Sequence, residues 1–202
     1  MASVTSGQPV TDGRRARRER GRLAVTEATI DLVLEGSIPP SAEQIAERAG
    51  VSAASLFRYF ETLDDLRRAT VDRYFERYTH VFEIPDIGVG ALSDRIKRFT
   101  KARSSLHEMT EPMARLARLR APEHVELDER LHLVRTTMSD QVRHHFDTEL
   151  ATRSPAQRED TVTVISTLTS FEAWDQARHD HQRSQQQISR AWSATITKIL
   201  GA

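Results

Sequence analysis

Residues 41–60, SAEQIAERAGVSAASLFRYF, limit the fold more than any other stretch of this chain. Apolar residues recur there at three- and four-residue spacing, as in the buried stripe of a short helix: Ile45, Ala46 and Ala49. Gly50 supplies the positive backbone dihedral at which a helix most readily ends, and Ser52 can cap a second helix directly afterwards. The segment therefore predicts two short helices that meet at a tight turn.

The second helix of this hairpin presents small and polar side chains at its leading end, as a helix that enters the DNA major groove does. Leu56, Phe57 and Phe60 are predicted to pack against the first helix. The other positions are candidates for contact with bases or phosphates: Ser52, Ala53, Ala54, Ser55, Arg58 and Tyr59. A hairpin that only contributes to the core of a helical protein is the alternative.

A basic segment precedes the hairpin, since Gly13–Arg22 contains six arginines and a single acid, Glu19. The formal net charge of the chain is zero, so affinity for nucleic acid has to come from such uneven placement of charge. Arginines beside a helix-turn-helix neutralise phosphates and can enter a minor groove. We expect DNA contacts from Arg14, Arg15, Arg17 and Arg18, with a solvated tail as the alternative.

Composition and motifs exclude several classes of function. The 202 residues include no cysteine, which rules out disulfides and thiolate chemistry and suits a reducing cytoplasm. No apolar run approaches the roughly 20 residues that cross a bilayer, so we expect no membrane partner. The chain carries no glycine-rich phosphate loop or catalytic motif. Asp175 and His179 have the spacing of metal ligands, but two ligands do not make a site, so we expect no enzyme, metal or cofactor.

The rest of the chain predicts helices without any strand. They are expected at Arg18–Glu35, from a Thr62 cap to about Phe82, and then at Leu92–His107, Pro112–Arg120, Glu123–Ala151, Pro155–His181 and Ser184–Leu200. We therefore predict an all-α chain with a flexible leader over residues 1–13. An N-terminal three-helix helix-turn-helix DNA-binding domain, linking helix included, is expected over residues 14–82, and a helical domain over residues 83–202.

The last two predicted helices carry apolar stripes. Val162, Ile165 and Leu168 recur on one of them, and Ile188, Trp192 and Ile196 on the other. Two such helices can pair with their symmetry copies in a four-helix bundle, or they can complete the core of a single chain. A homodimer would double the contacts of one small hairpin on a palindrome with half-sites about 34 Å apart.

The first 80 positions closely resemble the TetR family of bacterial transcriptional regulators. The residues that carry the resemblance are Ile45-Ala46, Ala49-Gly50-Val51-Ser52, Leu56-Phe57-Arg58-Tyr59-Phe60 and Leu66. It implies DNA contacts at the hairpin positions named above and at Ser41, which begins the preceding helix. Phe57 and Leu63 depart from the tyrosine and lysine usual in the family, so two contacts with phosphate are missing.

The resemblance also implies a small-molecule effector bound between the C-terminal helices and a homodimer held by the last two of them. Candidate pocket residues are Phe99, Arg103, His107, Met109, Met113, Leu116, Met138, Phe171 and Trp174, with ordinary core packing as the alternative for each. The expected function is a ligand-responsive regulator, more a repressor than an activator, that leaves its palindromic operator when the effector binds. An all-helical small-molecule binding protein without specific DNA binding is the alternative, and a helical metal-dependent enzyme a remote one.

Overall fold

The computed structural model describes residues 11–201, and every regular element in that range is a helix, which confirms the predicted all-α class. The chain divides between Tyr78 and Thr79 into two compact units, called unit 1 and unit 2 below. The boundary predicted after Phe82 lies four residues beyond this point, because the 3₁₀ helix η1 (Thr79–Phe82) belongs to unit 2. The predicted leader lies mostly outside the described residues.

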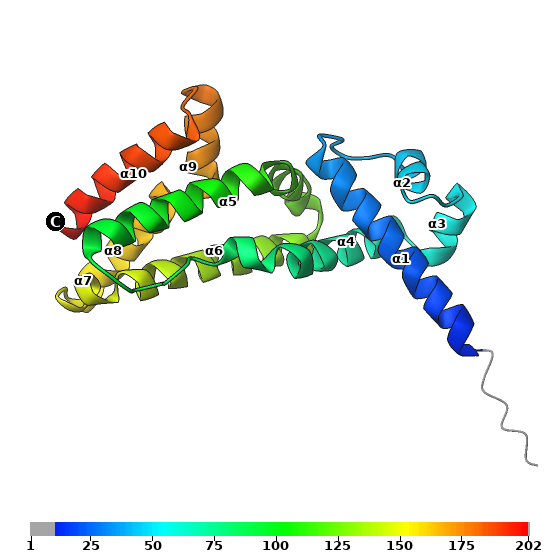
Figure 1. The fold of residues 1–202 in the computed structure, drawn as a ribbon, viewed down its shortest axis with the longest axis horizontal. Coiled ribbons are helices and arrows are strands. Elements are labelled where there is room, and N and C mark those ends of the chain that lie inside the picture. The colour runs from blue at the N-terminus through cyan, green and yellow to red at the C-terminus, as the bar shows by residue number, and fades with distance from the viewer. Residues whose placement is uncertain (1–10, 202) are drawn as a thin grey trace, which may run out of the picture. The chain divides into compact units, whose positions relative to one another are not determined.

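Unit 1 consists of four helices that pack around one apolar cluster (Figure 1). These helices are α1 (Thr11–Leu34), α2 (Ala42–Arg48), α3 (Ala53–Tyr59) and α4 (Leu63–Tyr78). The buried members of the cluster are Val25, Leu32, Ile45, Ala46, Leu56, Phe60 and Leu66. The predicted stripe of the hairpin's first helix therefore does face the core of the unit.

Helix α1 begins at Thr11, well before the predicted start at Arg18. The arginine-rich segment is therefore the first part of a helix, and not the solvated tail that was the alternative for it. Arginine is among the better helix formers, and α1 tolerates both Gly13 and Gly21 within its length. Acidic residues farther along α1 anchor it to α4, since Glu27 pairs with Arg73 at 2.5 Å and with Arg77 at 2.6 Å.

The predicted caps of the hairpin are confirmed. The Ser41 hydroxyl accepts a hydrogen bond from the Gln44 amide, and the Gln44 side chain accepts one from the Ser41 amide, which together form a capping box at α2. Gly50 has a φ of 66° after α2, and Ser52 caps α3 through the Ser55 amide. Because each of these bonds closes within a few residues, the turn is specified locally.

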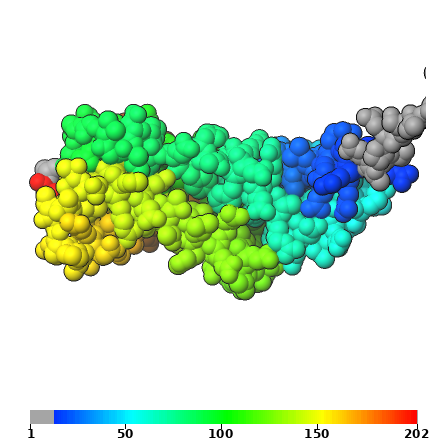
Figure 2. All heavy atoms as spheres, turned by 90° about the horizontal axis from the view of Figure 1, so that it is seen from below, coloured from blue at the N-terminus to red at the C-terminus, as the bar shows by residue number. Residues whose placement is uncertain are grey.

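Unit 2 is built on the long helix α5, which packs against α10, α6 and α9 (Figure 1). Its elements are α5 (Leu92–Arg120), the 3₁₀ helix η2 (Ala121–Glu123), α6 (Val125–His145), α7 (Asp147–Ala151), α8 (Pro155–Leu168), α9 (Phe171–Asp175), the π-helix η3 (Gln176–Asp180) and α10 (Gln185–Leu200). Successive parts of α6, α7 and α8 form a continuous outer surface of this unit in Figure 2. Ser154 and Ser184 cap α8 and α10, close to the helix starts predicted at Pro155 and Ser184.

Three predicted helix boundaries in unit 2 are wrong. Helix α5 continues through Pro112, because the carbonyl deprived of its helical donor belongs to Glu108, which is exposed to solvent. The predicted helix Glu123–Ala151 is interrupted at Phe146, and the predicted helix Pro155–His181 is interrupted at Thr169 and Ser170. At both interruptions a side chain from α5 binds a main-chain carbonyl, as described below.

The apolar stripes of the last helices complete the core of unit 2. Val162, Ile165 and Ile196 lie in one buried cluster, while Ile188 and Trp192 pack with Phe171 and Trp174 in another. These stripes are therefore not free to contact a second copy of the chain. Among residues 11–201, the helices are all too short or too polar to cross a membrane.

Candidate DNA-binding and ligand-binding sites

The leading end of α3 is open to solvent, as the hairpin pattern predicts. Ser52, Ala53, Ala54 and Arg58 are exposed and Ser55 is half-buried. The Ser52 hydroxyl lies 3.0 Å from the Ser55 hydroxyl, which accepts a bond of 3.1 Å from Nη2 of Arg58. Two hydroxyls and one guanidinium thus follow one another along the open side of the helix, where donors to phosphate or base edges are needed.

Tyr59 is held more firmly than the sequence indicates. A Cβ atom added to Gly21 would lie 2.3 Å from Cζ of the Tyr59 ring, so the ring rests directly on α1 at a position without a side chain. The expectation that Tyr59 is free is therefore corrected to a half-buried ring. The Arg58 guanidinium lies 5.7 Å from the same ring, so Tyr59 also limits the directions that Arg58 can take.

Arg22 serves the fold and not the open surface. Its Nη1 donates to the main-chain carbonyl of Tyr59 at 2.7 Å and to Asp65 at 3.3 Å, and its guanidinium lies 4.2 Å from the Phe60 ring. The hydrogen bond from Arg22 lowers the pKa of Asp65 below its ordinary value. This arginine therefore joins α1, the end of α3 and the start of α4, a role that its place in a basic run did not indicate.

Phe57 was expected to be buried, but 54% of it is exposed. Its neighbours Leu56 and Phe60 take the inward positions, at 0% and 1% exposure, and leave Phe57 on the outer side of α3. Leu63, at the start of α4, is 60% exposed. Both departures from the family pattern thus place an apolar side chain on the surface of unit 1, with no hydroxyl or ammonium group to meet phosphate.

The remaining predicted DNA contacts are exposed as well. Ser41 lies at the start of α2, and the arginines lie along the first turns of α1: Arg14, Arg15, Arg17 and Arg18.

Most predicted ligand-binding residues gather inside unit 2. Arg103 donates to the Met138 carbonyl at 3.3 Å and lies 5.2 Å from the Phe99 ring. One turn later, the His107 ring lies 5.8 Å from Phe171 and 5.9 Å from Trp174. These side chains are almost completely buried, while Met138 is half-buried.

The three other predicted pocket residues differ in burial. Met113 is 9% exposed and Leu116 half-buried, but Met109 is 52% exposed and faces away from the core, which corrects its assignment. Sequence reasoning missed Trp192, whose ring lies 6.3 Å from His107. Its apolar stripe was noticed, but nothing local in the sequence shows that α10 meets α5 at His107.

Burial lowers the pKa of both titratable groups in this cluster, His107 and Arg103. Desolvation lowers the pKa of His107 to about 4, against the hydrogen bond of 2.9 Å between Nε2 and the Thr169 carbonyl, which acts in the opposite direction. Desolvation likewise lowers the pKa of Arg103 to about 10. At neutral pH the imidazole is therefore uncharged and the guanidinium remains a cation.

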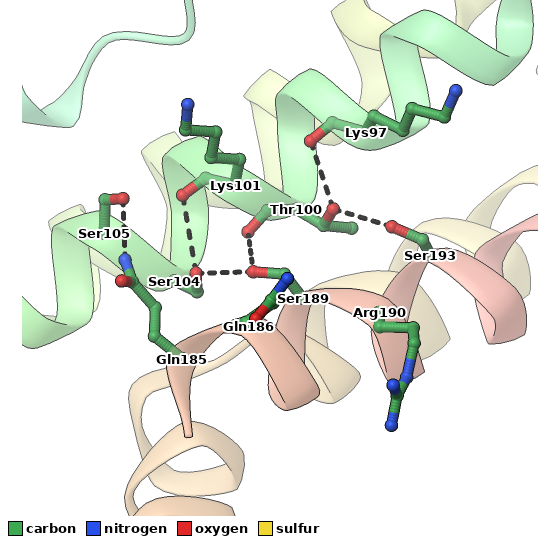
Figure 3. Close-up of a pocket in the computed structure, with 10 residues that line it drawn as sticks. All are labelled: Lys97, Thr100, Lys101, Ser104, Ser105, Gln185, Gln186, Ser189, Arg190 and Ser193. Atoms are coloured by element: carbon green, nitrogen blue, oxygen red, sulfur yellow. Dashed lines mark hydrogen bonds between the residues drawn. The ribbon is translucent and has the colours of Figure 1, made fainter. Parts of the chain in front are cut away.

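A polar groove of about 380 Å³ lies between α5 and α10 (Figure 3). Hydroxyls meet across it in pairs, Thr100 with Ser193 at 2.8 Å and Ser104 with Ser189 at 2.7 Å. The other lining residues are Lys97, Lys101, Ser105, Gln185, Gln186 and Arg190. None of the predicted pocket residues lines this groove, and its paired hydroxyls join the two helices.

The structure brings Glu111 close to Asp175 and His179, with potential ligand atoms within 4.8 Å of one another. Arg115 already donates to both carboxylates, at 3.1 Å to Glu111 and at 2.5 Å to Asp175. His179 Nε2 lies 2.8 Å from Glu111. A guanidinium thus occupies the position between the carboxylates, so we interpret this cluster as an ion-pair network between α5 and the α9–η3 segment.

Comparison with known proteins places the hairpin in a family. Residues 39–70 match the sequence pattern of the family described as bacterial regulatory proteins, tetR family. HTH-type transcriptional regulators of Mycobacterium tuberculosis and Mycobacterium bovis, both named as uncharacterized, are 43% identical to this chain over 75 residues. That segment covers 34% of this chain and only 38% of each relative, so the match spans well under half of their length.

Solved structures extend the likeness to the whole fold. A TetR-family regulator from Streptomyces coelicolor has a TM-score of 0.68 and 18% identity, over 88% of this chain and 81% of its own. One from Rhodococcus sp. has a TM-score of 0.66 and 16% identity, over 90% of this chain and 99% of its own. At such identities the likeness concerns the arrangement of helices alone.

Proposed function

Since this chain belongs to the TetR family of bacterial regulatory proteins, we propose that it regulates transcription by binding a palindromic operator as a homodimer. The observation that carries the proposal is the open leading end of α3, where Ser52, Ala53 and Ala54 are exposed beside Arg58. Small residues allow the helix to approach base edges, and alanine methyl groups can contact thymine methyls. The proposal includes a cytoplasmic location, where the operator would be.

The arginines of α1 supply the sequence-independent part of the binding. Arg14, Arg15, Arg17 and Arg18 lie on the exposed first turns of α1 and can neutralise phosphates beside the recognition helix. Their contribution is expected to depend strongly on salt, because each neutralised phosphate releases counterions. Specificity is expected from α3, and from DNA shape where alanines offer no hydrogen bond.

The experiment is selection of palindromic duplexes from a random pool, followed by fluorescence anisotropy on the selected site at physiological salt. Arg58→Ala should weaken binding by about 10-fold or more, whereas Lys101→Ala, which removes one exposed cation from unit 2, should leave affinity unchanged. If no sequence is enriched, or if both variants behave alike, the chain does not read DNA through α3. A small-molecule binding protein without specific DNA binding would then remain.

We place the dimer contact on the outer faces of α8 and α10, because their apolar stripes are already used within unit 2. Exposed small and β-branched residues on these faces permit close helix packing: Thr163, Val164, Thr167, Ala191 and Ala194. Val164→Glu should convert a dimer to monomers in sedimentation equilibrium and weaken operator binding. A wild-type chain that is monomeric at micromolar concentration would contradict this part of the proposal.

We propose repression relieved by a small effector that binds inside unit 2. The aromatic and methionine side chains around His107 and Arg103 are of the kind that line adaptable ligand sites. An effector weakens DNA binding only if it prefers one of two dimer shapes, and the coupling is reciprocal. Transcription from the selected operator in vitro, with and without this chain, separates repression from activation.

A further inference from the structure

Helix α5 carries two buried arginines with opposite surroundings. Arg95 is 4% exposed and pairs with both carboxylate oxygens of Glu149, while also donating to the main-chain carbonyls of His145 and Gly90. Arg103 is 2% exposed and has no acidic partner among the described residues. The same helix therefore provides an internal comparison between a compensated and an uncompensated buried cation.

The contacts of Arg103 satisfy little of its hydrogen-bonding capacity. Its Nη2 makes one bond, at 3.3 Å, to the Met138 carbonyl, and its Nε is buried without any partner. The face of the Phe99 ring, 5.2 Å away, offers only a weak electrostatic attraction. A guanidinium has five N–H donors, and a buried one without an anion is a costly feature of a folded protein.

A second unpartnered donor lies beside His107, one helical turn after Arg103. Nε1 of Trp174 is buried without a hydrogen-bond partner, and the Trp174 ring lies 5.9 Å from His107, which follows Arg103 by one helical turn. Nε2 of His107 is bonded to the Thr169 carbonyl, and the neutral ring offers no negative charge to Arg103. The cluster thus combines a free positive charge and free N–H groups with aromatic walls.

We propose that Arg103 anchors an acidic effector, a small molecule with one carboxylate and an apolar body, which binds among the aromatic rings of unit 2. The carboxylate accepts from the guanidinium, and the apolar part packs on Phe99, Phe171 and Trp174. The inference rests on the proposed function for the role of the bound molecule, but not for its binding. Since Arg103 is almost completely buried and its Nη2 lies 3.3 Å from the Met138 carbonyl, the ligand enters by displacing the flexible Met138 side chain.

The test compares acids with their uncharged amides on the full chain. Phenylacetate, cinnamate and octanoate are each paired with the matching carboxamide, and binding is measured by calorimetry and by the shift in melting temperature. A charge-assisted bond to Arg103 should make at least one carboxylate bind about 10- to 100-fold more tightly than its amide. If no pair shows this difference, the proposal is wrong.

Variants of the two arginines show whether Arg103 is responsible. Arg103→Met should abolish the preference for carboxylate and leave the melting temperature of the free protein unchanged or raised, because it removes an uncompensated buried charge. Arg95→Met should lower the melting temperature by about 5 °C or more, because it leaves Glu149 unpaired. Arg103→Lys, which keeps the charge, should retain part of the preference.

Two results would overturn the assignment. A carboxylate preference that survives in Arg103→Met places the anion elsewhere, for example in the polar groove between α5 and α10, which Lys97, Lys101 and Arg190 line. A loss of stability in Arg103→Met comparable with that of Arg95→Met gives Arg103 a structural role. DNA binding is measured separately, so carboxylate binding without operator release would refute the regulatory role and leave the ligand site standing.

Discussion

Acid should destabilise unit 2 through His107. The ring is 1% exposed, and burial lowers its pKa from the ordinary 6.5 to about 4. Between pH 6.5 and about pH 4, His107 is therefore mostly neutral in the folded chain and mostly protonated in the unfolded chain. The stabilising effect of the neutral imidazole is complete above pH 6.5 and is lost as the pH falls towards 4.

The magnitude follows from the two pKa values. At pH 5 the unfolded histidine is almost fully protonated while the folded one is not, and the difference amounts to about 2 kcal/mol of unfolding free energy relative to pH 7. It reaches about 3 kcal/mol near pH 4, below which it stays constant. The nearby positive charges of Arg103 and Arg118 act in the same direction as burial, whereas Glu172 and the Thr169 carbonyl oppose it.

The measurement is urea unfolding of wild type and His107→Gln at pH 7 and pH 5, at one protein concentration. Both tryptophans, Trp174 and Trp192, lie in unit 2, so their fluorescence reports its unfolding. Glutamine can still donate to the Thr169 carbonyl but does not titrate. Because His145 is also buried with a lowered pKa, wild type and variant should both lose stability, and the wild type should lose about 2 kcal/mol more. Equal losses would refute the argument, since His107 would then contribute nothing to the pH dependence.

Three further predictions concern unit 1. Gly21→Ala places a methyl group 2.3 Å from the Tyr59 ring and should destabilise the protein by about 1–2 kcal/mol in urea unfolding followed by circular dichroism. The net loss is smaller than the clash alone would cause, because alanine favours the helix. Unchanged stability would mean that the ring moves freely. Arg22→Met removes the bonds to the Tyr59 carbonyl and Asp65, so it should lower the unfolding free energy by about 1–2 kcal/mol and weaken operator binding. Weaker operator binding with unchanged stability would instead make Arg22 a DNA contact. Leu63→Lys should leave stability unchanged, because the side chain is 60% exposed. In anisotropy titrations it should steepen the slope of log affinity against log salt concentration by about one unit. An unaltered slope would place position 63 away from phosphate.

The features that the sequence predicted well depend on bonds that close within a few residues. Ser41, Ser52, Ser154 and Ser184 each cap a helix through an amide three residues ahead, and Gly50 adopts the positive φ that its position after α2 requires. Such signals are visible in a short window of sequence. The apolar spacing of Ile45 and Ala46 was equally informative, because the side chains that share one face of a helix also share the core.

The errors arise where a distant residue decides the local structure. Tyr59 appears as one more exposed residue of a recognition helix until α1 presents Gly21 beneath its ring. Arg22 belongs to a run of arginines that all look alike, yet it alone reaches the end of α3. In the same way Pro112 predicts a helix end, but the carbonyl that loses its donor belongs to the exposed Glu108, so the missing bond is tolerable.

The interruptions of α6 and α8 have one origin in α5, and they clarify what Arg103 does. Arg95 donates to the carbonyl of His145, where α6 ends, and His107 donates to the carbonyl of Thr169, where α8 ends. Each polar side chain thus takes over a carbonyl that the helix no longer uses. Arg103 makes the corresponding bond to Met138, but this residue lies inside α6, where the carbonyl also serves the helix. Of these three buried side chains, Arg103 is therefore the one that ends no helix and neutralises no acid, which leaves it available for an anion from outside the chain.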